Sequence, residues 1–433
     1  MNEDQTTASQ NELPLLSTPR ALVHFIDKTD QLEFLLDSLS GSSGAIAIDA
    51  ERASGFKYSQ RAYLIQLKAP NTNIFLLDPT SDKELCKSTG FESLRKLLAE
   101  REWILHAATQ DLPCLAELGL APGAIFDTEL SARLAGEPRV GLGSLTENLL
   151  GFRLAKEHSA ADWSTRPLPA TWLNYAALDV DVLHELAQAI KNLLVNQGKL
   201  EWANQEFQSL LSFKPKPQRE DRWRSITGLS KVRDQLSLEI ARRLWDSREK
   251  LAQKIDVAPS RLVPDSAIVA VSTEKPKSKP ELANQKSFTG RASRSYLDTW
   301  WSAVEAANKA TILPPVRADW VPGIPNHRNW AQKYPEADKR LRFAKSALID
   351  LSQKLNLPVE NLLTPEYLRN LCFTPPEEIN EETVEKRLMD LGARPWQRQL
   401  TSSVITEAFN LALKSPDEPT APAPQELDEH EAL

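Results

Sequence analysis

The sequence predicts an α/β domain at the start of the chain, followed by modules built only of helices. Three observations support this fold class. Between residues 21 and 119, short apolar runs alternate with segments of helical periodicity, as in a mixed α/β sheet domain. Beyond residue 213 no strand-like alternation persists, and proline-containing loops separate the helical segments. The chain has 433 residues, a length that corresponds to roughly two to four domains.

Four apolar runs are the candidate strands of the first domain, namely residues 45–49, 62–67, 74–78 and 103–106. Residues 91–98 carry apolar side chains at helical spacing, so we expect a helix there. From residue 128 to residue 213 the pattern is helical, and residues 171–194 form the longest candidate helix. The broken stretch KPKPQR at 214–219 ends the domain.

An internal repeat at an offset of 100 residues organises the rest of the chain. Residues 251–262 (LAQKIDVAPSRL) match residues 351–362 (LSQKLNLPVENL), with apolar and polar positions largely in step. Two copies of one small helical module explain this most simply. The sequence thus predicts a flexible N-terminus at 1–20, the α/β domain at 21–213, a helical module at 219–308, a linker at 309–334, a second module at 335–413 and a disordered acidic tail at 414–433.

The composition excludes several classes of protein. The 52 Lys and Arg against 59 Asp and Glu give a net charge of −7, which excludes nucleic-acid binding by bulk positive charge. Residues 219–298 are nevertheless locally basic, with 17 Lys and Arg against 11 Asp and Glu. Three scattered cysteines fit a reducing compartment and no disulfide framework. Without a secretion-signal pattern or a long apolar run, we expect a cytoplasmic protein with no membrane partner.

Five polar residues are candidates for chemistry. Asp49 and Glu51 lie two residues apart at the end of a candidate strand, so both side chains point to the same face. Two such carboxylates repel each other unless a cation such as Mg²⁺ or Mn²⁺ lies between them, although a solvated strand end is the commoner outcome for this pair alone. Asp111 begins a helical stretch, where it could cap the helix or face a site. Tyr175 and Asp179 share one helical face.

The segments around these five residues, taken in chain order, resemble the sequence motifs of DEDD-superfamily exonucleases, in the branch that carries a tyrosine. The segment DWSTRPL at 162–168 narrows the resemblance to ribonuclease D. Downstream, the first helical module is similar to the HRDC domain of that family, and the second module resembles a more divergent HRDC-like domain. The motifs are IDAE at 48–51, HAATQD at 106–111, YAALDV at 175–180, WRSITGL at 223–229 and LVPD at 262–265. Together they cover roughly residues 21–410 and are specific because they occur in order.

The resemblance implies a ribonuclease H-like catalytic domain with a central mixed sheet, followed by two small all-α HRDC-like domains. It implies a metal-dependent 3′–5′ exoribonuclease that releases nucleoside 5′-monophosphates. Asp49, Glu51, Asp111 and Asp179 would bind two divalent ions, Mg²⁺ or Mn²⁺, and Tyr175 would orient the attacking water. The implied partner is RNA with a free 3′ end, such as a tRNA precursor. We expect no organic cofactor, and the oligomeric state is not predicted.

Six basic residues are candidates for RNA contacts. Arg52 stands where family members often have phenylalanine, and it could stack on a base, pair with a phosphate or remain solvated. The other five are Lys156, Arg166, Arg222, Arg224 and Lys231. Two alternatives remain open at this point: an exonuclease that acts on DNA, and a catalytically silent RNA-binding scaffold. The presence of all four acids and the tyrosine argues against the scaffold.

Overall fold

The computed structural model describes residues 13–155, 161–215, 221–288, 290–316 and 323–415. The chain divides into two compact units, the first formed by residues 1–130, 139–192 and 207–320, the second by residues 131–138, 193–206 and 321–433. The predicted α/β domain therefore contributes two short segments to the second unit. Among the described residues, no helix combines the length and apolar character that crossing a membrane requires.

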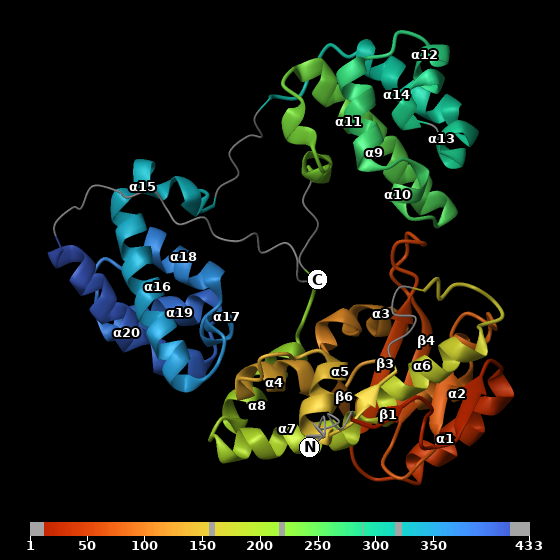
Figure 1. Cartoon of the computed structure of the whole chain (residues 1–433), viewed down its shortest axis with the longest axis vertical. Helices are drawn as coiled ribbons and strands as arrows, with labels where there is room; N and C mark the ends of the chain where they lie inside the picture. The colour runs from red at the N-terminus through yellow and green to blue at the C-terminus, as the bar shows by residue number, and fades with distance from the viewer. Residues whose placement is uncertain (1–12, 156–160, 216–220, 289, 317–322, 416–433) are drawn as a thin grey trace, which may run out of the picture. The chain divides into compact units, whose positions relative to one another are not determined.

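A six-stranded mixed sheet forms the centre of the α/β domain (Figure 1). Its strands are β2 Val23–Ile26, β3 Ile46–Arg52, β4 Ala62–Lys68, β5 Ile74–Leu77, β6 Glu102–Leu105 and β7 Ala124–Asp127. They lie in the order β2-β5-β4-β3-β6-β7, and β4 runs antiparallel to both of its neighbours. The remaining neighbours are parallel, so the predicted mixed sheet is confirmed.

Strand β3 separates an apolar face of the sheet from an acidic one. Ile46, Ile48 and Ala50 are buried in a core with residues of three helices: α1 Leu32–Ser40, α2 Thr89–Ala99 and α3 Leu112–Glu117. Successive strand residues point to opposite faces, so Asp49 and Glu51 project from the other side. There helix α6, Ala170–Asp181, packs across β3, β4 and β5. The apolar core thus fixes which face carries the acids.

The prediction of one continuous helix over residues 171–194 is wrong. The structure has two helices instead, α6 and α7 Leu183–Asn196. Helix α6 ends at Asp181, whose backbone carbonyl accepts hydrogen bonds from the side chains of Lys68 and Arg20. These bonds come from β4 and from the start of the chain, so helical periodicity could not indicate them.

The beginning of the described chain is ordered, contrary to the expected flexibility of residues 1–20. Strand β1, Leu15–Leu16, pairs with β8, Arg153–Leu154. Arg20 is bound to the α6–α7 junction through its backbone and side chain. The expectation was therefore wrong for residues 13–20, because a two-residue strand and the two ion pairs of Arg20 leave little trace in a sequence pattern.

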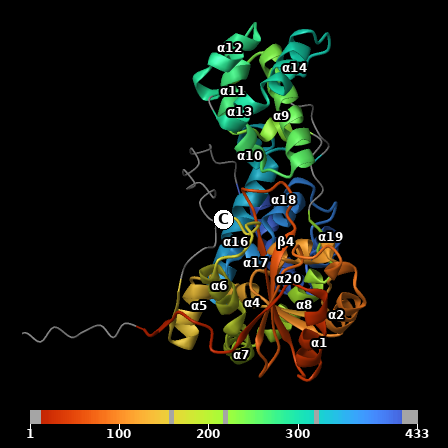
Figure 2. The ribbon, with the colours of Figure 1, turned by 90° about the vertical axis from the view of Figure 1, so that its right-hand side faces the viewer.

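Only helices follow residue 213 among the described residues (Figure 2). The first module contains α9 Gln235–Ile255, α10 Pro259–Leu262, α11 Asp265–Glu274, α12 Lys279–Asn284, α13 Arg291–Ser295 and α14 Leu297–Asn308. The second contains α15 Trp330–Lys333, α16 Pro335–Leu355, α17 Val359–Leu362, α18 Pro365–Phe373, α19 Glu381–Leu391 and α20 Pro395–Lys414. The remaining helices are α4 Thr128–Ala135, α5 Leu142–Leu145 and α8 Leu200–Leu210.

The 100-residue repeat is confirmed at the level of individual turns. Helices α9 and α16 end 100 residues apart, and each is followed by a residue with positive φ, 50° at Asp256 and 48° at Asn356. The short helices α10 and α17 then start at equivalent positions. Part of the predicted linker belongs to the second module, because Trp330 of α15 is fully buried. The predicted acidic tail lies outside the described residues from residue 416 on.

Candidate active site

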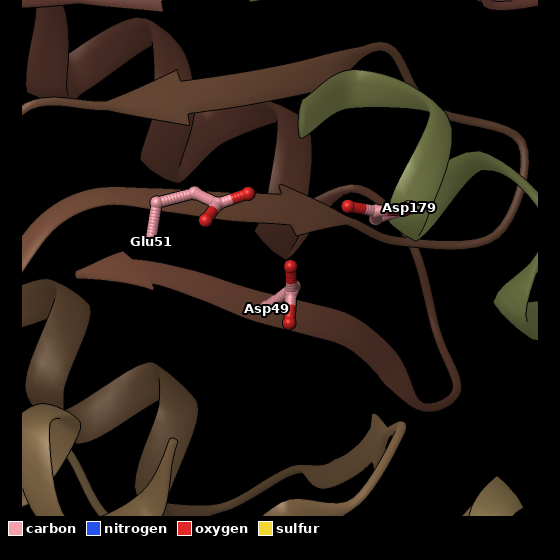
Figure 3. A group of neighbouring side chains, drawn as sticks. All are labelled: Asp49, Glu51 and Asp179. Atoms are coloured by element: carbon pink, nitrogen blue, oxygen red, sulfur yellow. The ribbon is translucent and has the colours of Figure 1, made fainter. Parts of the chain in front are cut away.

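Three carboxylates converge between the sheet and helix α6. Asp49 and Glu51 come from β3 and Asp179 from α6, and one oxygen of each lies within 4.8 Å of the others (Figure 3). Ligands of one divalent cation lie about 2.0–2.6 Å from the ion. Oxygens within 4.8 Å of one another can therefore bind the same ion. The alternative of a solvated strand end does not hold, because neither β3 acid is exposed.

Asp111 joins this carboxylate cluster from helix α3. It occupies the N-cap position, yet its side chain makes no capping hydrogen bond. Instead its carboxyl group forms a hydrogen bond with the carboxyl group of Asp49. The four predicted metal ligands therefore meet in space, and the capping role considered for Asp111 is excluded.

Burial raises the pKa of all four acids, and their mutual repulsion adds to this effect at Glu51, Asp111 and Asp179. Four buried carboxyl groups with little compensating positive charge are unfavourable in the ionised state. The donors are all oxygens, the ligands that hard divalent cations prefer. The cluster therefore fits a divalent cation, which Asp49, Glu51 and Asp179 would hold directly, with Asp111 beside them.

Tyr175 lies one helical turn before Asp179, and the two side chains form a hydrogen bond. Burial raises the pKa of Tyr175, and the charges of Asp179, Glu51 and Asp49 raise it further. The phenol therefore stays protonated at neutral pH and donates to the Asp179 carboxylate. A protonated phenol is a poor general base, so this geometry suits a group that positions other groups.

The carboxylate cluster opens into a cavity of about 480 Å³. This volume lies in the range of small-molecule sites and suits one nucleotide. Arg52 lines the cavity, and its charge opposes part of the rise in the pKa of Asp49, Glu51 and Asp111. His106 also lines it, with Nδ1 2.9 Å from the Thr128 hydroxyl.

The other predicted RNA-binding residues lie in different surroundings. The Arg166 guanidinium donates to both carboxylate oxygens of Asp78, at 2.6 and 2.8 Å, and to the Trp163 carbonyl. It therefore ties the 162–168 segment to the sheet. Arg224 stacks over Trp223 and donates to a backbone carbonyl, whereas Lys231 is exposed. Lys156 lies outside the described residues. RNA contacts of these side chains stay predictions.

Sequence reasoning missed Asp127, a buried residue at the end of β7. Its carboxylate accepts hydrogen bonds from four backbone N–H groups, those of Ala107, Ala108, Glu129 and Leu130. Burial raises its pKa to about 6 despite these bonds. Ala107 has φ of 60°, an unusual conformation for alanine, and Asp127 stabilises it. An acid between an apolar run and a helical stretch is a recognisable cap signal, but β7 itself was not predicted.

Replacing Asp127 by alanine should lower the free energy of unfolding by about 2–4 kcal/mol, because several buried N–H groups lose their acceptor at roughly 1–3 kcal/mol each. Turnover should also fall by about tenfold or more, since the Ala107–Ala108 turn leads directly to Asp111. Denaturant unfolding and single-turnover hydrolysis measure the two effects. Asp37→Ala, on the exposed side of α1, is the control. An unaltered unfolding midpoint for Asp127→Ala would contradict this role.

Asp181 is a second residue that the pattern did not identify. Burial would raise its pKa, but hydrogen bonds from Lys68 at 2.5 Å and from Arg20 outweigh burial and lower it. The ionised carboxylate thus anchors the end of α6 to β4 and to the N-terminal segment. Because Asp179 lies two residues earlier on α6, this anchor helps to fix the carboxylate cluster.

Three known families match successive parts of the chain. The family described as 3′-5′ exonuclease matches residues 23–195, the HRDC domain matches residues 237–304, and the 3′ to 5′ exonuclease C-terminal domain matches residues 323–409. The first match contains the whole carboxylate cluster. The second and third fall on the two repeated helical modules.

Named relatives agree with these matches. Ribonuclease D of Gluconacetobacter diazotrophicus is 31% identical over 62% of this chain and 67% of its own length. Ribonuclease D of Bartonella henselae is 26% identical over 80% of each chain. Among solved structures, Escherichia coli RNase D has a TM-score of 0.61 at 25% identity, covering 85% of this chain and 98% of its own. A protein from Bifidobacterium adolescentis reaches a TM-score of 0.83 at 35% identity, covering 92% of this chain and 100% of its own.

A mixed sheet that presents four clustered acids and a tyrosine, with helical modules after it, defines a 3′–5′ exonuclease of the DEDD type. The chain belongs to the ribonuclease D family and is a 3′–5′ exoribonuclease. The predicted fold class and enzyme class are thereby confirmed.

Proposed function

We propose that this enzyme binds two divalent cations, Mg²⁺ or Mn²⁺, at Asp49, Glu51, Asp111 and Asp179 and hydrolyses the last phosphodiester of RNA. The convergence of these four acids from β3, α3 and α6 carries the proposal. Bound cations would supply positive charge to the phosphate in the transition state. The raised pKa values of the acids support this, because a bound cation offsets both the burial and the mutual repulsion that raise them.

The protein's own side chains then align the reactants. Tyr175 donates to Asp179, and the oxygen of its phenol would accept a hydrogen bond from the attacking water. Arg52, at the wall of the cavity, pairs with a phosphate of the terminal nucleotides. The cavity suits one nucleotide, so the 3′ end must be unpaired to enter it, and the products are nucleoside 5′-monophosphates.

The substrates we propose are structured RNAs with short unpaired 3′ tails, such as tRNA precursors. The similar E. coli RNase D is an exoribonuclease involved in structured RNA processing. The helical module predicted at 219–308 is locally basic. This charge supports further contacts with RNA by Arg222, Arg224 and Lys231. A cytoplasmic location, where such RNAs are processed, remains part of this proposal.

The test compares a tRNA-like RNA with an unpaired 3′ tail, the same RNA with a paired 3′ end and a DNA copy of the tailed strand. Each is incubated with Mg²⁺, Mn²⁺ or EDTA, and products are separated by length. We expect stepwise shortening of the tailed RNA alone, with either metal, down to the paired stem. Shortening of DNA only would refute the RNA assignment, and no shortening with any metal would support a silent scaffold.

Replacing Tyr175 by phenylalanine should slow the hydrolytic step about 10- to 10²-fold, since a positioning hydrogen bond is lost while the carboxylates remain. Metal affinity should stay within about twofold of wild type. Single-turnover rates at several Mg²⁺ concentrations separate the two quantities. Tyr334→Phe, at an exposed tyrosine, is the matched control. A pH–rate profile that loses a basic limb in Tyr175→Phe would instead indicate that the phenol acts as a base.

A further inference from the structure

The first helical module contains a cavity of its own, with a volume of about 510 Å³. Its lining residues come from the turn Arg222–Ser225 and from helices α9 and α10, together with Asp265, the first residue of α11. These helices pack against one another within the module (Figure 1). None of the lining residues belongs to the carboxylate cluster, and the volume is within the range of ligand sites.

One wall of this module cavity is flat and suited to stacking. Trp245 of α9 is partly buried against the module core and contributes its remaining surface to the cavity. The Arg222 guanidinium lies over the Trp245 ring, 5.4 Å from its centroid. Proteins recognise unpaired RNA bases by stacking them on aromatic rings or on guanidinium planes. Each such stack contributes about 1–3 kcal/mol.

Two neighbouring residues of α9 supply polar groups beside this stacking wall. The Glu249 carboxylate lies between two arginines, with Oε2 3.9 Å from Arg222 and Oε1 4.0 Å from Arg248, and its buried Oε2 accepts no hydrogen bond from any described residue. Nε of Arg248 is likewise buried and donates to no described acceptor, although Nη1 binds Asp265 at 2.7 Å. Buried groups without partners are rare because each costs roughly 1–3 kcal/mol.

The charges at the module cavity balance, which decides the kind of ligand. Among the described lining residues, Arg222 and Arg248 are offset by Glu249 and Asp265, so these residues leave no surplus positive charge for a free phosphate. A neutral, flat group with hydrogen-bond donors fits better. Guanine presents two adjacent N–H donors, N1 and N2, that match a carboxylate, and an O6 acceptor that matches an arginine N–H. Uracil has one N–H donor between two acceptors and matches less well.

We propose that this cavity binds one unpaired guanine base of an RNA substrate, stacked on the wall formed by Trp245 and Arg222 and recognised by Glu249. The inference rests on the proposed action on RNA and adds a second, base-selective site to it. The hydroxyls of Ser225 and Ser260 line the same cavity and can contact the ribose or the base edge.

The test measures RNA affinity with the full-length Asp179→Asn protein, in which substrate is not consumed. Fluorescence anisotropy compares three labelled single-stranded decamers: all uridine, the same with one internal guanosine, and the same with inosine, which lacks the N2 amino group. We expect the guanosine decamer to bind about 5- to 30-fold more tightly than the uridine decamer, with inosine between them. Equal affinity of the three would overturn the proposal.

Two added substitutions test the site itself. Glu249→Gln keeps the size of the side chain and should abolish the preference for guanosine, whereas Trp245→Leu should weaken binding of the guanosine decamer at least about fivefold. Glu274→Gln, at an exposed residue of the same module, should leave the preference intact. If Trp245→Leu unfolds the module, Glu249→Gln still decides the question. A guanosine preference that survives Glu249→Gln would overturn the assigned role.

A hydrolysis assay distinguishes failure of the guanine site from failure of the proposed function. With Asp179 intact, the otherwise unchanged protein should shorten both the all-uridine and the guanosine decamer, and Glu274→Gln should do so at the same rate. Hydrolysis without any base preference rejects only the guanine site. Guanosine-selective binding without hydrolysis in any divalent metal rejects only the proposed catalytic function.

Discussion

Replacing Asp179 by asparagine should reduce RNA hydrolysis by about 10³-fold or more and leave RNA affinity within about twofold of wild type. The amide removes one of three carboxylates whose oxygens lie within 4.8 Å of one another, so the charge that would hold a divalent cation falls. It also weakens the acceptor of the Tyr175 hydrogen bond. Binding should persist because the contacts proposed for the helical module are untouched.

Single-turnover hydrolysis of a 3′-labelled RNA and anisotropy of the same RNA measure the two quantities. Asp37→Asn makes the same chemical change at an exposed position of α1 and should alter neither. A wild-type hydrolysis rate for Asp179→Asn would exclude the carboxylate cluster as the catalytic site. If Asp179→Asn lost both RNA affinity and hydrolysis, Asp179 would support the fold rather than the reaction.

The site was predictable where it depends on local periodicity and on ordered motifs. The two-residue spacing of Asp49 and Glu51 placed both on one face of β3, and the four-residue spacing of Tyr175 and Asp179 placed both on one face of α6. The convergence of these pairs depends on strand order, which spacing does not encode. It came from the family resemblance, and the structure gives its geometry.

The supporting residues were not predictable for a physical reason. Asp181 is stabilised by Lys68 and Arg20, which are 113 and 161 residues away in the chain, and Asp127 by the N–H groups of a turn about 20 residues earlier. Each partner alone looks like an ordinary surface charge or cap. The same non-local bonds end α6 at Asp181, where apolar periodicity would continue the helix to residue 194.

Divalent cations should stabilise the folded enzyme strongly at pH 8 and only weakly at pH 5. Without metal, the cluster's pKa values are raised above those of the unfolded chain, so the folded state binds more protons. Stability of the metal-free protein therefore falls as pH rises from the unfolded pKa values towards the raised folded ones. A cation replaces those protons, and at 100 times its Kd it should contribute about 2.7 kcal/mol.

Thermal unfolding with Mg²⁺ or EDTA, repeated between pH 5 and pH 8, measures this linkage without any substrate. In EDTA at pH 8, Asp179→Asn should be more stable than wild type by about 0.5–2 kcal/mol, because one repelling charge is gone, and it should respond less to Mg²⁺. Asp37→Asn should behave like wild type in every condition. If Asp179→Asn were instead less stable in EDTA, the ionised carboxylates would not repel each other in the folded state. The acids would then be held by protein partners alone, and the argument for a cation among them would fail even if the enzyme still hydrolysed RNA.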